Sequence, residues 1–169
     1  MSAANLYRFY DGKLAIGVAV ANAEQAALLT ACDQAVGSAG PDVSAQLIAL
    51  FHANIDTTHR KMKQTPLLFD LGLTVAREKK ELRRQFLDEI EARIEKILAT
   101  GQNPAAFESA AIKVRGRMIL IACAPFVLPW MMLNEPFGNP RSMVEPLIRS
   151  LVSGIGIEFP AATAPVSSP

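Results

Sequence analysis

The sequence carries little net charge, few cysteines and no long hydrophobic segment. Its 17 Lys and Arg residues nearly balance 16 Asp and Glu residues, so the formal net charge of the 169-residue chain is only +1. This balance argues against a chain coated with nucleic-acid-binding charge, so any contact with nucleic acid must be local. The two cysteines, Cys32 and Cys123, are too few for a zinc site. Because both lie in apolar surroundings, they are predicted to be small buried residues in a reducing cytoplasm.

The pattern also lacks targeting and membrane-spanning segments. No basic stretch followed by an apolar core opens the sequence, so we expect no secretory signal and a cytoplasmic location. The apolar run over residues 118–133 is shorter than the roughly 20 residues of a spanning helix and contains Pro125 and Pro129. We predict a helix buried on nearly every side there and no membrane partner. A small membrane-associated helical protein is the less favoured alternative.

Signatures of catalysis and of metal binding are missing as well. The sequence has no glycine-rich phosphate loop and no G-x-S-x-G nucleophile elbow. The carboxylates of residues 78–95 alternate with basic residues, which is typical of a solvated helix face. His52 and His59 are seven residues apart without a carboxylate or thiol set near them, so neither is predicted to bind metal. We therefore expect no enzymatic activity, no metal and no cofactor.

What the sequence does contain is material for a helical core. Half of its residues are hydrophobic and 20% are charged, which suits a packed domain and excludes wholesale disorder. Helix-forming residues dominate, and no stretch alternates polar and apolar residues long enough to predict a strand. We predict an all-α bundle of about seven helices. The expected segments are 2–8, 13–36, a helix capped at 42 or 44, 66–78, 79–100, a helix from 103 into the 118–133 run, and 141–152.

Local signals suggest several helix boundaries. Residues 37–41 are expected to form a loop, after which either Asp42 or Ser44 can cap the next helix. Pro66 opens a helix, and Asn103 with Pro104 resembles a cap and first helical residue. The most regular amphipathic pattern is that of residues 79–100, with Glu89 and Arg93 as an i,i+4 pair on the exposed face. Its apolar stripe consists of Leu82, Phe86, Ile90, Ile94 and Ile97.

The last two helices are too apolar to have only one buried face in a small monomer. Residues 141–152 carry Met143, Leu147, Ile148 and Leu151 at helical spacing, and the helix before them is apolar nearly all round. We predict a homodimer through residues 105–133 and 141–152, which would form a four-helix interface. The alternative is that these helices simply complete the core of a monomer.

The start of the sequence holds its most specific motif. Residues 6–13 read LYRFYDGK, which is an apolar residue, a tyrosine, any residue, two aromatic residues, two short residues and a lysine. This order resembles the end of the recognition helix in regulators of the tetracycline repressor (TetR) family. The stretch 17–21 inside the following helix is similar to the linking helix of that family. On composition alone, the same residues would form a capped turn between two ordinary helices.

The chemistry of this segment suits DNA. Polar atoms near the start of a short helix can reach base edges in a major groove, and a tyrosine hydroxyl and a lysine ammonium can hold phosphates. The next helix adds backbone N–H groups and a favourable dipole at its start. The resemblance therefore implies double-stranded operator DNA as a partner. The candidate DNA-binding residues are Ser2, Asn5, Tyr7, Arg8, Tyr10 and Lys13.

In the family, the DNA-binding unit has two further helices before the recognition helix. This sequence opens with the segment that resembles the recognition helix. We expect the chain as written to bind DNA poorly, because few phosphate contacts remain. We favour Met1 as an internal methionine of a longer regulator; alternatively, a truncated chain acts as a dimerising partner of full-length subunits. The expected parts are a remnant of the helix-turn-helix domain (1–13), a ligand-sensing and dimerisation domain (14–159) and a disordered tail (160–169).

By the same resemblance, the body of the chain is a sensor. A small apolar effector would enter a cavity between helices and weaken DNA binding by changing the spacing of two recognition helices. The predicted function is a ligand-responsive repressor, and the alternative is a truncated dimerisation module that does not bind DNA. Apolar side chains at helical spacing suit such a ligand, although the same spacing is typical of a core. The candidates are Phe51, Ile55, His59, Met62, Phe69, Phe86, Ile90, Met118 and Ile121.

Overall fold

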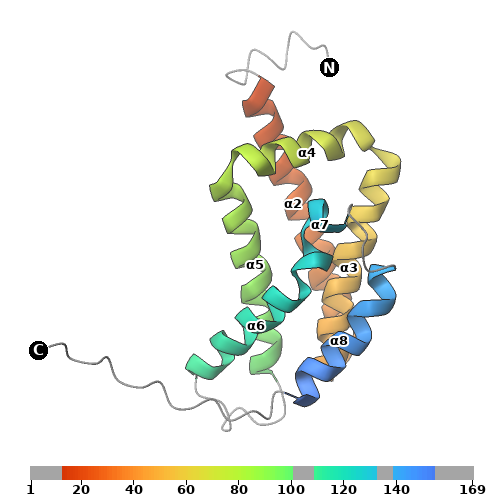
Figure 1. Ribbon diagram of the computed structural model, residues 1–169, viewed down its shortest axis with the longest axis vertical. Helices are drawn as coiled ribbons and strands as arrows, with labels where there is room; N and C mark the ends of the chain where they lie inside the picture. The colour runs from red at the N-terminus through yellow and green to blue at the C-terminus, as the bar shows by residue number, and fades with distance from the viewer. Residues whose placement is uncertain (1–12, 101–108, 133–138, 155–169) are drawn as a thin grey trace, which may run out of the picture.

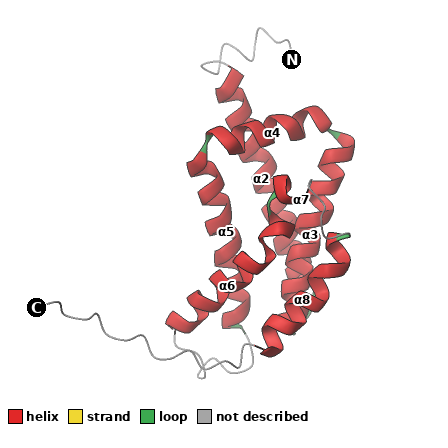
Figure 2. Cartoon of the chain, viewed as in Figure 1, coloured by secondary structure: helices red, strands yellow, loops and turns green. Residues whose placement is uncertain are grey.

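The computed structural model describes residues 13–100, 109–132 and 139–154. In these ranges the chain forms seven helices and no strand, which confirms the all-α prediction (Figure 2). The helices are α2 (Lys13–Ser38), α3 (Val43–Gln64), α4 (Pro66–Glu78), α5 (Lys80–Ala99), α6 (Ser109–Val127), α7 (Pro129–Met132) and α8 (Pro140–Gly154).

Most of the long helices follow the long axis of the molecule, and α4 lies across one end of the bundle (Figure 1). The main pairings are α2 with α3, α3 with α8, and α5 with α6. α4 connects α3 to α5 and packs on α2 near the end where α2 begins. Because α4 crosses the other helices rather than running beside them, it can cover a space between α2 and α5.

Short turns separate α3, α4 and α5. The Ala45 N–H donates to Oδ1 of Asp42 at 2.7 Å, so Asp42 rather than Ser44 caps α3. Pro66 begins α4, a position at which a backbone N–H would have no partner within the helix, so its absence costs nothing. The proline also forces a non-helical backbone on the residue before it. Lys79 alone separates α4 from α5, and its ψ of 79° lies outside the helical region. The predicted boundaries of α4 and α5 are confirmed to within one residue.

α2 ends later than the sequence predicts. Residues 37 and 38, expected in a loop, belong to the last turn of the helix. The Ser38 hydroxyl donates to the Gln34 carbonyl at 3.0 Å, which supports this extra turn. The turn that follows contains Gly40 at a φ of 77°, a backbone conformation that a side chain would strain. The loop is therefore shorter than the run of small residues suggests.

The core lies where α3 faces α2, α5, α6 and α8. The predicted apolar stripe of α5 divides into two parts. Ile90, Ile94 and Ile97 are buried in this core, as expected. Leu82 and Phe86, closer to the start of α5, are only half-buried and lie where α4 crosses the bundle. The same apolar face of α5 thus packs into the core along its second half and lies beneath α4 near its start.

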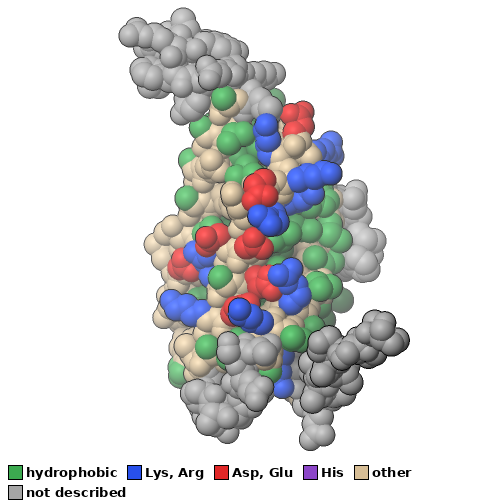
Figure 3. Space-filling view, turned by 90° about the vertical axis from the view of Figure 1, so that its left-hand side faces the viewer, with side chains coloured by type: hydrophobic (Ala, Val, Ile, Leu, Met, Phe, Trp, Pro, Cys, Tyr) green, Lys and Arg blue, Asp and Glu red, His purple; other side chains and the backbone are tan. Residues whose placement is uncertain are grey.

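An ion-pair cluster links α5 to α2. Arg93 donates from Nε and Nη2 to the two carboxylate oxygens of Asp33, at 2.8 and 2.9 Å, and from Nη1 to Glu89 Oε2 at 2.7 Å. The predicted Glu89–Arg93 pair is confirmed, whereas the bond to Asp33 joins residues far apart in sequence. Figure 3 shows acidic and basic side chains interspersed on the side of the molecule where α5 lies, as a solvated helix face requires.

The apolar run over residues 118–133 differs from the prediction in two ways. It is not one helix, because α6 ends at Val127 and α7 starts at Pro129, where a proline without an N–H begins a new helical segment. It is also not buried on nearly every side. Ile121 is 66% exposed and Val114, one turn before the run, is 48% exposed. One face of α6 is therefore left uncovered by the described part of this chain.

Among the described residues, one helix is long and apolar enough to cross a membrane by length and composition, namely α2 over Ala15–Ser38. In the structure it is a helix of the bundle that packs against α3 and α4. The same criterion does not select the run over residues 118–133 that the sequence first brings to attention.

Both cysteines are buried, as predicted. The Cys32 thiol donates to the Leu50 carbonyl at 3.6 Å, and burial raises its pKa from an ordinary 9.0 to about 11. Burial also raises the pKa of the Cys123 thiol, to about 12. The thiolate is the reactive form, so both groups should be inert at neutral pH in the folded protein.

We expect these thiols to make the fold sensitive to alkali. Because the pKa of each thiol is higher in the folded chain than in the unfolded chain, their contribution is fully present below pH 9.0 and is lost as pH rises toward about 11. The free energy of unfolding should fall by up to about 1.4 kcal/mol per pH unit and per thiol in that window. Urea denaturation at several pH values measures the fall. A double variant, Cys32→Ala with Cys123→Ala, should show a smaller fall, and an equal fall would contradict the prediction.

The crossing of α4 over α2 depends on a glycine. A Cβ atom at Gly17 would lie 3.0 Å from Val75 Cγ2 and 3.1 Å from Leu71 Cδ1, which is tighter than ordinary van der Waals contact. A residue with a side chain at this position would require the side chains of Val75 and Leu71 to move by a few tenths of an ångström. The contact lies in the second turn of α2, close to the point where residues 1–12 join the helix.

Candidate ligand-binding site

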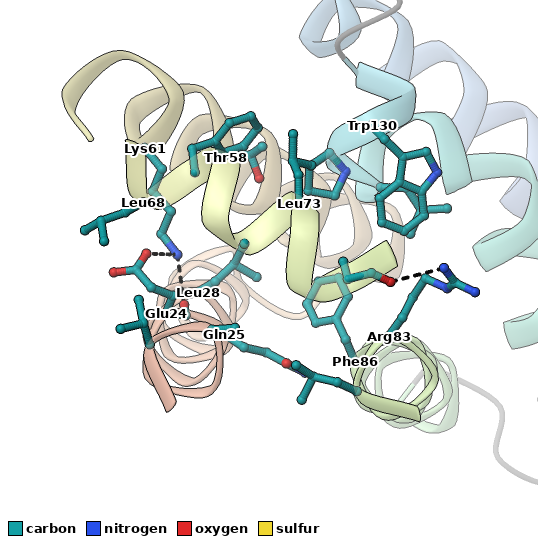
Figure 4. A pocket seen from close by; sticks show the side chains of 18 of the residues that line it. Glu24, Gln25, Leu28, Thr58, Lys61, Leu68, Leu73, Arg83, Phe86 and Trp130 are labelled. Atoms are coloured by element: carbon teal, nitrogen blue, oxygen red, sulfur yellow. Dashed lines mark hydrogen bonds and ion pairs between the residues drawn. The ribbon is translucent and has the colours of Figure 1, made fainter. Parts of the chain in front are cut away.

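A cavity of about 160 Å³ lies beneath α4, between α2, α3, α5 and the α6–α7 junction. It is partly open to solvent, and most of its lining is apolar. Figure 4 shows the lining side chains converging from these helices, with Leu28, Leu73 and Phe86 around the middle. The lining residues are Val20, Ala21, Glu24, Gln25, Leu28, Thr58, Lys61, Thr65, Leu68, Phe69, Gly72, Leu73, Ala76, Leu82, Arg83, Phe86, Leu128, Pro129 and Trp130.

The apolar middle of the cavity follows from the crossing of α4. A helix that lies across others cannot fill the groove beneath it along its whole length, so side chains of α2 and α5 that would otherwise pack together remain apart. Leu73 of α4, Leu28 of α2 and Phe86 of α5 all line this space (Figure 4). The result is a small concave site with an apolar centre and a few polar groups at its edges.

One edge of the cavity carries a neutralised ion pair. Lys61 of α3 lies 2.6 Å from Glu24 Oε2 of α2 and also donates from Nζ to the Glu24 carbonyl at 2.9 Å. Figure 4 shows this pair beside Leu68, at the opposite edge of the cavity from Arg83 and Trp130. Because the ammonium already has a carboxylate partner, a ligand anion gains little from this edge.

The opposite edge carries an arginine and an aromatic ring. Arg83 of α5 donates from Nη1 to the Ala76 carbonyl at 3.2 Å, and its guanidinium lies 5.7 Å from the centre of the Trp130 ring of α7. A cation at this distance from an indole face is attracted to it. In the described part of the chain, no Asp or Glu forms an ion pair with Arg83. The cavity therefore has a paired cation at one edge and one without a carboxylate partner at the other.

Gly72 also lines the cavity, in the middle of α4. A Cβ atom built there would meet no other atom within 4 Å, so the space in front of this residue is open. In contrast to Gly17, this glycine is not required by close packing. Its absent side chain adds to the room beneath α4.

The predicted ligand-binding residues divide by position. Phe69 of α4 and Phe86 of α5 line the cavity. The structure places the other candidates elsewhere: Phe51, Ile55 and Ile90 are buried in the core, and His59 and Met62 are half-buried on α3 outside the lining. Met118 borders a surface hollow between α5 and α6, and Ile121 points to solvent.

Sequence reasoning missed the polar edges of the site and its wall on α2. Arg83 was one of several basic residues in a charged helix face, and nothing in its spacing distinguishes it from its neighbour Arg84. Trp130, the single tryptophan of the chain, offered the clearest available signal because it lies between prolines and methionines at a helix break. The contribution of α2 depends on how α4 crosses it, which the sequence pattern does not encode.

Of the predicted DNA-binding residues, Lys13 is the first residue of α2. Ser2, Asn5, Tyr7, Arg8 and Tyr10 lie outside the described residues, as do the predicted helix over 2–8, the cap at Asn103 with Pro104, and the tail. Within the ranges that the structure describes, no group of three or more His, Cys, Asp and Glu residues could hold a metal ion. His52 lies 3.2 Å, through Nε2, from the Arg141 carbonyl at the surface.

A second surface stands out on the outer side of α6 and α8. Val114 and Ile121 are seven residues apart on α6 and so share a face, and Met143 of α8 is 45% exposed. α6 and α8 also contact each other. We call these three residues the α6–α8 apolar face. Exposed apolar side chains are typical of protein interfaces.

The comparisons with known proteins bear on the body of the chain. Residues 44–139, more than half of the sequence, match the family model described as the tetracyclin repressor-like, C-terminal domain. The match includes nearly all of α3 and the whole of α4 to α7, and so contains most of the cavity lining. No curated protein and no solved structure matches the chain.

Proposed function

Because the chain belongs to the tetracyclin repressor-like family, we propose that it is a ligand-responsive transcriptional regulator of the repressor type. A small apolar effector binds in the cavity beneath α4 and releases the protein from double-stranded operator DNA in the cytoplasm. The family consists of regulatory domains that are generally non-enzymatic. In this proposal residues 1–13 contact DNA, with Ser2, Asn5, Tyr7, Arg8, Tyr10 and Lys13 as the contacting residues. Residues 14–159 sense the ligand and dimerise.

One observation carries the proposal: α4 both lines the cavity and packs against the beginning of α2. Phe69 and Leu73 of α4 line the cavity, while Leu71 and Val75 of α4 lie against Gly17 of α2. A ligand that shifts α4 would also alter its contact with α2, because α4 packs closely on α2 at Gly17. α2 in turn continues from the segment that resembles a recognition helix. Ligand binding and the position of that segment are coupled through one rigid helix.

The homodimer predicted from the sequence fits this mechanism. Operators of such regulators are read by two recognition helices at a fixed spacing, so the sensor must hold two copies together. The α6–α8 apolar face supports a two-fold interface in which the same residues meet on both copies. It equally favours the second candidate function, a dimerisation module that does not bind DNA itself.

A gel-shift experiment distinguishes the two functions. With the residues encoded in frame upstream of Met1 included, we expect a retarded complex with DNA from the gene's own promoter that weakens by orders of magnitude between about 50 and 200 mM salt. The chain as printed is tested beside it. Addition of one-ring compounds, namely toluene, phenylacetamide and phenylacetate, should release the DNA in at least one case. Stable dimers without any DNA complex would favour the dimerisation module instead, and DNA binding that none of the compounds affects would contradict the ligand response.

A further inference from the structure

The two cations at the cavity differ in what they can offer a ligand. The Lys61 ammonium is 2.6 Å from the Glu24 carboxylate, so its charge is already balanced. The Arg83 guanidinium has five N–H donors, of which one is used on the Ala76 carbonyl. Its other donors face neither Asp nor Glu within ion-pair distance in the part of the chain that the structure describes. A ligand anion would therefore bind at the Arg83 edge.

The surroundings of Arg83 increase the strength of such a contact. Its side chain is partly buried, and its neighbours along the lining include Phe86, Pro129 and Trp130. Charge-assisted hydrogen bonds are stronger where apolar groups exclude water. The planar fork of a guanidinium matches the two oxygens of a carboxylate, which can accept two parallel hydrogen bonds. The Trp130 ring holds the guanidinium from one side and limits its freedom before a ligand binds.

The size of the cavity restricts the rest of the ligand. Its volume is about 160 Å³. An apolar protein cavity of about 150 Å³ accommodates benzene, so this space holds one aromatic ring or an aliphatic group of similar bulk. A compound with several fused rings would not be enclosed by it. The side chains around the middle, Leu28, Leu73 and Phe86, supply the apolar contacts that such a group needs.

From these observations we infer that the effector is a small amphipathic carboxylic acid with one ring or a short aliphatic chain. Its carboxylate accepts two hydrogen bonds from Arg83, and its apolar part lies under α4 between α2 and α5. The inference rests on the proposed function, because it takes the cavity as the effector site. It goes further by assigning the chemical class of the effector and the residue that selects it.

The test compares an acid with its neutral counterpart. Phenylacetate and phenylacetamide have nearly the same shape, as do hexanoate and hexanamide, but only the acids carry a charge at pH 7. Each is titrated by isothermal calorimetry and by fluorescence of Trp130, the single tryptophan, which lines the cavity. At least one acid should bind roughly tenfold or more tightly than its amide.

Variants of two neighbouring arginines test whether the preference for the acid comes from Arg83 itself or from the overall positive charge of this helix face. Arg83→Gln should weaken binding of the acid roughly ten- to hundredfold and leave the amide unchanged, while Arg83→Lys should weaken the acid less. Arg84→Gln is the matched control. Arg84 is 69% exposed and pairs with Glu81 at 2.8 Å, so this variant should bind like the parent protein. Circular dichroism confirms that each variant is folded.

Each result has a defined meaning. Amides that bind as tightly as the acids, an acid preference that survives in Arg83→Gln, or no binding by any of the four compounds would overturn the inference. If an amide binds and releases DNA, the inference fails while the proposed regulator stands. If an acid binds through Arg83 but DNA binding never responds, the assigned ligand class stands while the proposed regulator fails.

Discussion

Replacement of Ile121 by aspartate is expected to convert the proposed homodimer into a monomer. Ile121 is 66% exposed and belongs to the α6–α8 apolar face, and a two-fold interface contains the substitution twice. Two carboxylates would then lose their water close to each other, which costs several kcal/mol. We expect dimerisation to weaken by a factor on the order of a hundred or more, as about 1.4 kcal/mol corresponds to tenfold.

Size-exclusion chromatography with light scattering at micromolar concentration measures this effect. Leu67→Asp is the control, because Leu67 is even more exposed, at 84%, but lies on α4 outside the α6–α8 apolar face. The Leu67 variant should remain a dimer. A parent protein that is monomeric at micromolar concentration would refute the homodimer, and an Ile121 variant that still dimerises would place the interface elsewhere.

Truncation of Phe51 and truncation of Phe86 are expected to have different effects, although the sequence makes both residues candidates for ligand binding. Phe51 is fully buried in the core, so Phe51→Ala should lower the free energy of unfolding by about 3–5 kcal/mol. For a chain of this size, that corresponds to a fall in Tm on the order of 10 °C. Phe86 is half-buried beside the cavity, so Phe86→Ala should cost less stability and chiefly change ligand affinity.

Urea denaturation followed by circular dichroism, together with titration of phenylacetate, separates the two effects. Phe51→Leu, which keeps most of the apolar volume, should recover a large part of the stability lost in Phe51→Ala. If Phe51→Ala left stability unchanged and reduced binding of the ligand instead, the assignment of Phe51 to the core would be wrong.

Much of the fold follows from local signals in the sequence. Asp42 and Pro66 mark helix starts because a cap and a missing N–H act within one turn, and the spacing of Ile90, Ile94 and Ile97 predicts the buried face of α5. The recognition-helix motif at residues 6–13 predicts the family, which the match over residues 44–139 confirms.

The site is less predictable because its walls meet only through the tertiary arrangement. Phe51 and Phe86 have the same helical spacing relative to their apolar neighbours, yet one lies in the core and the other under α4. The difference arises from the angle at which α4 crosses α2, and that angle depends on the contact at Gly17. Nothing in the sequence distinguishes Arg83 from Arg84. In the structure, Arg83 lies beside the Trp130 ring at the cavity, whereas Arg84 is exposed and pairs with Glu81.

At Gly72, the stability of α4 and the room for a ligand in the cavity favour different residues. Glycine inside a helix costs about 1 kcal/mol relative to alanine, and here an added methyl group would meet no neighbour. Alanine would therefore make α4 more stable through its helix propensity, while its methyl group would take up space at the lining of the cavity. Engineering for heat resistance alone would favour that exchange and reduce the room for an effector. At this position, the residue that stabilises the helix most is not the one that leaves most room for a ligand.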